Sequence, residues 1–452
     1  MKHKLNLLED DIKVLFFKYV STSVLGMITV SLYILFDTIF IGRGIGKEGL
    51  TALNISLPIY NIIYGTGMLI GGGGATAMSI SRGSGDEKSA VKFFKSSVTL
   101  GVIMGAFYSI TGTLFLDKIA LALGATKDML PLVKEYLGVI LLFSPFFLMV
   151  QNLTALVRND RGYKRAMFSA IAGGLTNLVF DYIFIYPLNM GMRGAAIATV
   201  MSAMISVSIL SLHFTGENHL KLGVTALDLK VVRRITAIGL AGFIIELSSG
   251  IAIFLFNKEL LNSIGELGVA AYSIIANCSI MLVAIITGIA QGIQPIVSIN
   301  HGAMKNKRAL SARNLGLASG VITGILFLLL GLWKPEVIAS AFTSETGEMI
   351  AMTVEGIKRY FIAFPLMGIT IVMGAYFQAI AKNNYSNTIS LFRGVIFIGI
   401  LLKLLPLAFG VNGIWLTVPF SELLSLGLIM AVLVLERRSF FGKVLGQKAE
   451  AI

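Results

Sequence analysis

Two carboxylic acids interrupt apolar segments in the first half of the chain. Asp37 lies in the apolar run 14–42, and Asp181 lies in a second run at 166–187. An ionised carboxylate is costly in hydrocarbon, so an acid inside such a segment normally marks a cavity, an ion path or a proton relay. Both acids are therefore candidates for holding a proton or a small cation.

Two polar residues are expected at the same depth as these acids. Asn177 precedes Asp181 by one helical turn, so the two share a helix face. Thr199 lies about as far beyond the turn at 187–194 as Asp181 lies before it. At 1.5 Å per residue, these three side chains and Asp37 should lie roughly 10 Å below the outer surface. We predict that Asp37, Asn177, Asp181 and Thr199 form a cation-coupling group for H⁺ or Na⁺.

A further acid, Glu246, lies in the middle of the apolar segment 235–257, with no basic residue in reach on its own helix. It is a possible functional acid of the second half of the chain. The alternative for Glu246 is a protonated, hydrogen-bonded structural role. For the first two acids the alternative is helix capping or pairing with Arg43 or Arg193.

The composition shows what kind of protein must position these residues. Of 452 residues, 56% are hydrophobic and 13% are charged, with a mean hydropathy of +0.83. These values predict an all-α polytopic membrane protein. The single cysteine, Cys278, excludes an intramolecular disulfide and a cysteine-based metal site. The chain has no H-E-x-x-H or G-x-S-x-G motif, which argues against an enzyme.

A membrane span needs about 20 apolar residues, and twelve segments meet this requirement. They are 14–42, 52–81, 94–116, 135–157, 166–187, 194–214, 235–257, 268–299, 311–333, 359–381, 390–409 and 414–435.

The net charge of +13 is distributed as membrane topology requires, and we do not expect nucleic acid as a partner. The N-terminal tail and every second loop carry 26 of the 37 Lys and Arg residues, and the remaining segments carry 11. Basic residues near span ends favour the cytoplasmic side. We expect a plasma-membrane (inner-membrane) protein with both termini in the cytoplasm and no cleaved signal peptide.

The two halves of the chain repeat each other with a displacement of 219 residues. The matched pairs include Gly83 and Gly302, Pro187 and Pro406, Gly191 and Gly410, Gly194 and Gly413, and Ser202 and Ser421. Asp181 is not repeated, because its counterpart is Ile400. The repeat predicts two six-helix lobes, 1–214 and 233–452, joined by a cytoplasmic linker at 215–232, with parallel orientation in the membrane.

Several segments together resemble the multidrug and toxic compound extrusion (MATE) transporters. They are V-S-L-Y-I-L-F-D-T-I-F-I-G-R-G-I-G in the first span, R-N-D-R-G-Y-K-R-A, N-L-V-F-D-Y-I-F-I-Y and G-M-R-G-A-A-I-A-T further on, and F-Q-A-I-A-K-N-N with G-V-N-G-I-W-L-T-V-P in the second lobe. The resemblance covers essentially the whole chain.

The resemblance implies export of organic cations and drugs, hence antibiotic resistance, by alternating access driven by H⁺ or Na⁺ entry. It implies no cofactor, and small organic cations and membrane lipids as the partners of a monomer. The family's first-lobe coupling residues match Asp37, Asn177, Asp181 and Thr199. A seventh-helix Glu of some members matches Glu246, but the tenth span here lacks the acid that accompanies it.

Two other functions are weighed against this one. A lipid-linked oligosaccharide flippase of the same superfamily would need basic residues in its central cavity, whereas the spans are expected to be nearly free of internal Lys and Arg. An intramembrane enzyme or a channel is less consistent with the sequence, because a pore would be expected to repeat its filter in both halves.

Overall fold

The computed structural model describes residues 5–215, 220–340 and 347–449, with side chains described as far as Glu436. Helices make up nearly all of these residues, and no strand occurs among them. The twelve predicted spans are confirmed as ten single helices and two bent pairs. The single helices or helical runs are α1 (Ile12–Gly44), α2 (Lys47–Gly83), α3 (Glu87–Leu114), α7 (Tyr163–Ile185), α8 (Gly191–Ser211), α9 (Leu229–Ser263), α10 (Glu266–Gly302), α11 (Asn306–Trp333), α15–α16 (Asn383–Leu391 and Phe397–Phe409, with a π-helical turn at Phe392–Ile396) and α17 (Val411–Ala449).

The fourth and tenth spans are each divided by a bend, which the hydropathy pattern does not reveal. The fourth consists of α5 (Leu130–Leu142) and α6 (Ser144–Asn159), bent by 51°. The tenth consists of α13 (Glu348–Tyr360) and α14 (Ala363–Ala379), bent by 47°. Pro145 and Pro365 stand in the first turns of α6 and α14. A proline lacks the N–H that would continue the preceding helix, so each span restarts at its proline. Two short surface helices, α4 (Leu116–Ala122) and α12 (Pro335–Ser340), complete the chain.

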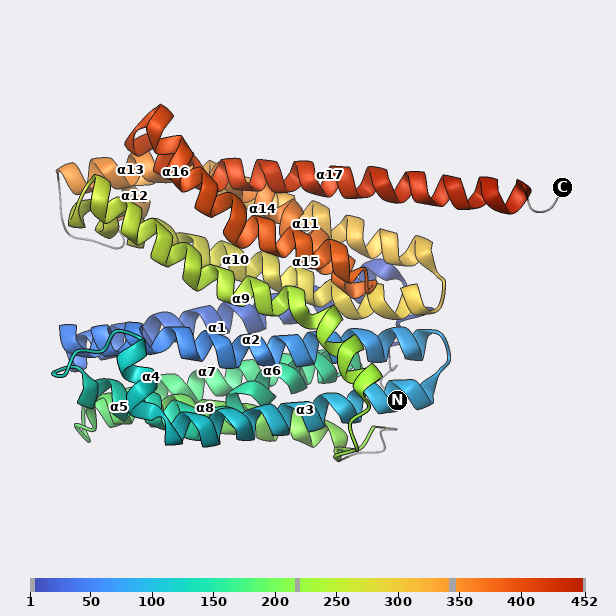
Figure 1. Cartoon of the computed structure of the whole chain (residues 1–452), viewed down its shortest axis with the longest axis horizontal. Coiled ribbons are helices and arrows are strands. Elements are labelled where there is room, and N and C mark those ends of the chain that lie inside the picture. Colours follow the sequence, from blue (N-terminus) through green and yellow to red (C-terminus); the bar gives the residue numbers. More distant parts are fainter. Residues whose placement is uncertain (1–4, 216–219, 341–346, 450–452) are drawn as a thin grey trace.

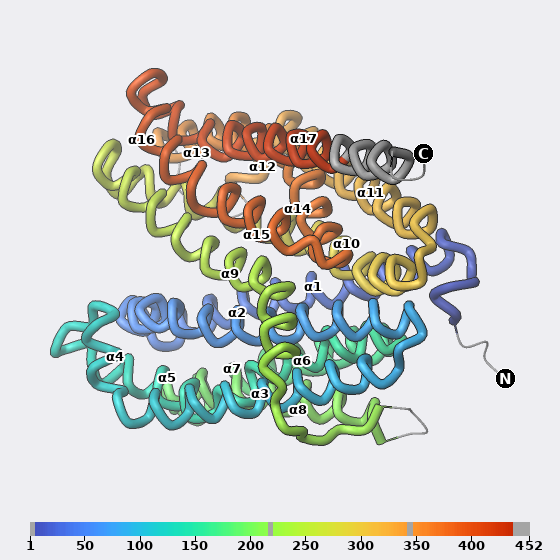
Figure 2. Tube along the Cα trace, turned by 45° about the vertical axis from the view of Figure 1, so that its right-hand side comes forward, coloured from blue at the N-terminus to red at the C-terminus, as the bar shows by residue number. Residues whose placement is uncertain are grey.

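The helices form two lobes that lie side by side (Figure 1). The first lobe comprises α1 to α8 and the second comprises α9 to α17. The main contacts between the lobes come from three helix pairs: α2 packs along α9, α1 packs along α10, and α2 also packs against α10. Figure 2 shows these helices near the middle of the molecule. This arrangement matches the two-lobe architecture expected from the repeat.

Glycines bring the two lobes into backbone contact, and they do so in symmetric pairs. A Cβ at Gly83 would overlap the carbonyl oxygen of Ile299, and a Cβ at Gly302 would overlap that of Ile80. Gly83 and Gly302 are 219 positions apart, and so are Ile80 and Ile299, so the two contacts are equivalent in the repeat. Small residues of this kind allow membrane helices to approach closely. The internal duplication therefore extends to the lobe interface.

The lobes are in close backbone contact near one end of the bundle. We call this the basic end: it carries the loops at 84–86, 160–162 and 303–305. The glycine contacts lie in the halves of α2 and α10 that lead to it. Toward the other end, α2 and α9 diverge in both views (Figures 1 and 2). A substrate path between the lobes would thus be blocked at the basic end.

The first helix of the second lobe, α9, begins within the stretch predicted as the linker. The described residues 220–228 contain no helix, and α9 begins at Leu229 rather than after residue 232. Asp228 caps α9 by accepting a hydrogen bond from the backbone N–H of Lys230 at 2.9 Å, and it pairs with Lys92 at 2.7 Å. With these contacts α9 begins four residues before residue 233. The division into domains 1–214 and 233–452 stays a prediction.

Candidate functional site

The four predicted cation-coupling residues come together inside the first lobe. Helix α7 carries Asn177 and Asp181, and α8 carries Thr199; all three are buried, with Asp181 fully inaccessible. The amide nitrogen of Asn177 donates to the Thr199 hydroxyl at 3.4 Å. Asp37 reaches the group from α1, and its carboxyl group lies next to that of Asp181. The ion pairs of Asp37 and Asp181 with Arg43 or Arg193 that we considered do not form among the described residues.

This group contains an unusual concentration of oxygen atoms without donors. Within the described part of the chain, Asp37 Oδ1, Asn177 Oδ1 and both carboxyl oxygens of Asp181 are buried and accept no hydrogen bond. Buried polar atoms normally have partners, and a cluster of exceptions calls for a specific explanation. A bound cation, or protons on the carboxyl groups, would supply the partners that these four oxygen atoms lack.

Tyr136, which the sequence analysis did not single out, also belongs to this neighbourhood. It comes from α5, is 5% exposed, and lies near Thr199 and the two acids. Tyrosine is common in apolar spans, so its residue type alone gives no signal. The bend between α5 and α6 determines where α5 lies, and that bend is itself absent from the sequence pattern.

A cavity extends from this group through the first lobe toward the basic end, and its empty space is about 850 Å³ when space open to solvent is included. Thr199 belongs both to the cation group and to the cavity wall. Aromatic side chains make up much of the wall, namely Tyr33, Tyr60, Tyr64, Phe147 and Tyr163. On α1 the lining runs from Thr22 to Tyr33, a length of about 16 Å at 1.5 Å per residue.

The expectation that the spans are nearly free of internal basic residues is wrong at two positions. Arg158 lies in the last turn of α6, is only 6% exposed and lines the cavity. Arg393 lies in the π-helical turn of the eleventh span, with its side chain 17% exposed. The sequence places each close to a span end, and the packing of neighbouring helices buries them.

Glu246 does not join the four cation-coupling residues. It lies on α9 with its side chain against Gly65 of α2, at the contact between the lobes. No hydrogen bond or ion pair in the described part of the chain links its carboxylate to Asp37 or Asp181. A role for Glu246 in the second lobe stays a prediction.

In the second lobe, an ion pair occupies the position that the cavity has in the first. Glu422 is 2% exposed; it accepts from Thr370 at 2.5 Å and from Arg393 Nη2 at 2.8 Å and Nε at 3.1 Å. The first-lobe counterparts, 219 positions earlier, are Gln151 for Thr370, Gly174 for Arg393 and Ala203 for Glu422. All three counterparts line the first-lobe cavity. Equivalent positions of the repeat therefore line a cavity in the first lobe and hold a buried ion pair in the second.

We expect Glu422→Gln to lower the stability of the second lobe substantially. The variant leaves Arg393 as a buried charge without its carboxylate, and breaking a buried pair in this way costs about 3 kcal/mol. Thermal unfolding in detergent would measure the loss. Glu355→Gln is the matched control, because its pair with Arg359 is exposed and should contribute less than about 1 kcal/mol. Equal stability of the two variants would contradict a structural role for the buried pair.

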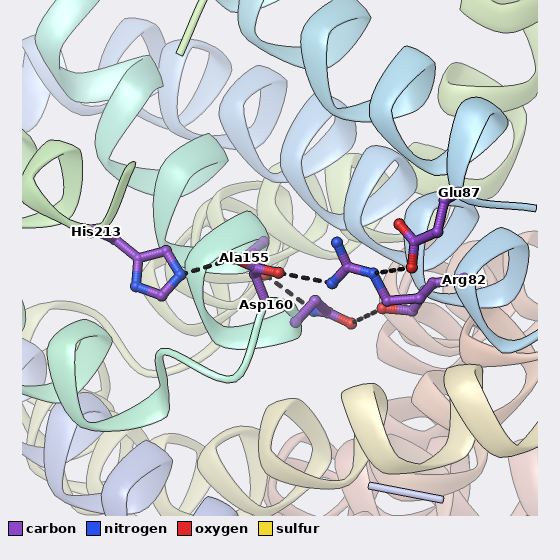
Figure 3. Close-up of polar contacts among 7 residues, drawn as sticks. Arg82, Glu87, Ala155, Asp160 and His213 are labelled. Atoms are coloured by element: carbon purple, nitrogen blue, oxygen red, sulfur yellow. Dashed lines mark hydrogen bonds and ion pairs between the residues drawn. The ribbon is translucent and has the colours of Figure 1, made fainter. Parts of the chain in front are cut away.

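A polar cluster at the basic end joins three connections of the first lobe (Figure 3). Asp160 follows α6 and accepts from Arg82 of α2 at 2.6 Å and from His213 at 2.8 Å. Arg82 also pairs with Glu87 at the start of α3. Burial alone would raise the pKa of Asp160, but the hydrogen bonds and charges of His213 and Arg82 outweigh it and hold this pKa below its ordinary value.

We therefore expect the stability contributed by Asp160 to depend on pH. Because its pKa is lowered in the native state, the contribution is complete above the ordinary value of about 3.9. It is lost as the pH falls through the lowered native pKa. Thermal unfolding should show wild type more stable than Asp160→Asn at pH 7, by about 2 kcal/mol, with the difference shrinking below pH 4. A difference that does not change with pH would contradict this account.

Comparison with known proteins agrees with this geometry. The MatE family model matches residues 23–183 and 235–405, one segment in each lobe and well over half of the chain. The chain belongs to the MatE family.

Curated relatives and solved structures of MatE proteins extend the likeness over almost the whole chain. Multidrug export protein MepA of Staphylococcus aureus (strain MRSA252) is 24% identical over 423 residues, covering 92% of each chain. A structure of MATE in complex with MaL6 has a TM-score of 0.89 at 21% identity, covering 97% of this chain and 100% of that one. An outward-facing multidrug resistance MATE transporter of the MOP superfamily has a TM-score of 0.88 at 22% identity, with coverages of 97% and 98%. These structures share the fold.

Proposed function

We propose that this protein is a cation-coupled multidrug antiporter, which exports amphipathic organic cations in exchange for H⁺ or Na⁺. It is a membrane transporter of the MatE family and not an enzyme. The proposal draws on the multidrug export activity that the name MepA gives to a relative matching 92% of this chain. The observation that carries the coupling is the group of four buried acceptor oxygens beside the first-lobe cavity.

The oxygens of this group suit either coupling ion. Na⁺ would bind the carboxylates of Asp37 and Asp181, the amide oxygen of Asn177 and the hydroxyl of Thr199. Protons would neutralise the two adjacent carboxylates instead. In both cases the entering ion removes negative charge from the end of the cavity, where an organic cation would otherwise be attracted.

Alternating access follows if the basic end faces the cytoplasm, as the charge distribution predicts. The described conformation then has the lobes closed toward the cytoplasm and diverging toward the outside. Ion binding from outside would lower the affinity for the organic cation and release it. A ligand can drive such a change only if its affinity differs between the two states. Ion and substrate would meet this condition because the negative charge of Asp37 and Asp181 attracts both, so that binding of one weakens binding of the other.

The function is tested by efflux of a fluorescent organic cation from proteoliposomes containing the wild-type protein. An inward proton gradient and an inward sodium gradient are imposed separately. We expect one of the two gradients to accelerate efflux and so to identify the ion. Absence of efflux under both gradients would contradict the proposal and would favour a lipid-linked oligosaccharide flippase. Ion conductance without saturable exchange would instead indicate a channel.

A further inference from the structure

The route from the cation-coupling group to the basic end of the first lobe passes a buried arginine. Thr199 of the cation-coupling group and Arg158 both line the first-lobe cavity. Arg158 lies beside α1, with its Nη1 3.5 Å from the hydroxyl of Ser23. Ser23 and Asp37 are 14 positions apart on α1, which corresponds to about 21 Å at 1.5 Å per residue. An ion that moved from the cation-coupling group toward the basic end would therefore have to pass this guanidinium.

The rest of the cavity wall offers a small cation little resistance. Ser202 and Ser206 follow Thr199 on α8 at spacings of three and seven residues, so the three hydroxyls share a helix face. All three residues line the cavity. A hydroxyl has one donor hydrogen and two acceptor lone pairs, so this face can take over part of the hydration of Na⁺ or pass a proton onward. Among the described residues of the wall, Arg158 alone has a charged side chain.

The charge of Arg158 is not neutralised by an acid. The residue is 6% exposed, and no ion pair within the described part of the chain includes it. Its Nη1 donates to the side-chain oxygen of Gln291 at 2.6 Å, whereas its Nε is buried without a hydrogen-bond partner. The buried Arg393 of the second lobe, by contrast, pairs with Glu422 at 2.8 Å. A buried charge without a counter-ion is costly, so this one is expected to do what a neutral side chain could not.

We propose that Arg158 is an electrostatic barrier, which keeps H⁺ and Na⁺ from leaking to the basic end while the lobes are in contact there. Two positive charges repel each other far more strongly inside a protein than in water, and an arginine can exclude protons and cations from a membrane pore in this way. The inference rests on the proposed export function, because an ion that crossed without substrate would dissipate the gradient that drives export.

The bond to Gln291 connects this barrier to the arrangement of the lobes. Gln291 belongs to α10 of the second lobe, whereas Arg158 belongs to α6 of the first. Separation of the lobes at the basic end would break this bond and free the guanidinium to leave the route. The coupling ion would then be released only in the conformation that also admits substrate from the basic end.

Ion leak in the absence of substrate tests the barrier. Proteoliposomes containing the pH-sensitive dye pyranine would receive an inward proton gradient without any organic cation, with valinomycin and potassium clamping the membrane potential. Internal pH should relax in wild-type vesicles nearly as slowly as in protein-free vesicles. For Arg158→Gln we expect relaxation to be about tenfold faster or more, because the repelling charge is gone. Uptake of radioactive sodium under a sodium gradient gives the same comparison for Na⁺.

Gln291→Glu separates the charge of Arg158 from its mechanical role. The new carboxylate would neutralise the guanidinium and would also strengthen the bond between the lobes. A barrier made by charge predicts a faster leak in this variant, whereas a simple link between the lobes predicts an unchanged or slower one. Arg158→Lys keeps the positive charge and should leak at close to the wild-type rate. Lys164→Gln removes an exposed positive charge nearby and is the matched control, with the wild-type rate expected.

Three results would overturn the barrier: a fast leak in wild type, a slow leak in both Arg158→Gln and Gln291→Glu, or an equally fast leak in Arg158→Lys and Arg158→Gln. If Arg158→Gln does not fold, Gln291→Glu carries the test, because it leaves the arginine in place. Efflux of the organic cation by wild type, with slow leaks in all variants, would overturn the barrier and leave the export function intact. Fast leaks in Arg158→Gln and Gln291→Glu, without wild-type efflux under either gradient, would overturn the export function and support the barrier.

Discussion

Asp181→Asn is expected to abolish gradient-driven efflux while leaving the protein folded. The substitution keeps the shape of the side chain but removes its ionisable group and places an amide donor beside Asp37. The coupling ion then loses its main ligand. Couplings between sites reach about 150-fold, so we expect the efflux rate under an ion gradient to fall about 100-fold. Fluorescence measurements on proteoliposomes would record it.

The control for this variant is an acid outside the cation group. Asp117 lies on the surface helix α4, where it pairs with Lys134 with 60% of its side chain exposed. Asp117→Asn should transport at the wild-type rate. Thermal unfolding should show Asp181→Asn at least as stable as wild type, because replacing a buried carboxylate by an amide removes a desolvation cost. Undiminished gradient-driven efflux by Asp181→Asn would show that the cation site lies elsewhere.

Gly239→Val should prevent the lobes from closing at the basic end. A Cβ at Gly239 would overlap the backbone carbonyl oxygen of Leu69 on α2, so α2 and α9 cannot pack as they do here. Overpacking of this kind costs about 1–3 kcal/mol, which lowers the population of the closed state by about 5- to 150-fold. We expect transport to fall by a similar factor.

A distance between the lobes would reveal the change directly. Lys88 and Lys307 are exposed near the starts of α3 and α11 at the basic end, one in each lobe. Spin labels at these two positions, in a Cys278→Ala background, should report a longer distance in Gly239→Val than in its parent. Gly374→Ala is the control, because a Cβ at Gly374 meets no atom within 4 Å. Unchanged distances in Gly239→Val would contradict the role assigned to this contact.

Much of the architecture and the centre of the site follow from sequence features with a direct physical cause. Span number depends on the length of apolar runs, and the repeat appears as glycines and prolines at a fixed displacement. Asp181 is identifiable because an acid in an apolar segment is expensive, and Asn177 because it lies one turn away on the same helix. The role of these residues in coupling is still a prediction, although the structure places them together.

The features that could not be predicted depend on packing between helices that are distant in sequence. Tyr136 reaches the acids only because the fourth span bends before Pro145. The burial of Arg158 depends on its neighbours on α1 and α10, not on its own segment. The pair of Glu422 with Arg393 connects residues 29 positions apart. None of these contacts leaves a periodic signal in the sequence.

The central claim is tested most directly by measuring the ion entry that export of the organic cation drives. Proteoliposomes would be loaded with a fluorescent organic cation at equal pH and equal sodium concentration on both sides. As the cation leaves, intravesicular pH and sodium uptake are recorded together. The account predicts entry of H⁺ or Na⁺ in step with efflux for wild type, and none for Asp181→Asn. Wild-type efflux of the organic cation without entry of either ion would contradict coupled antiport at this site.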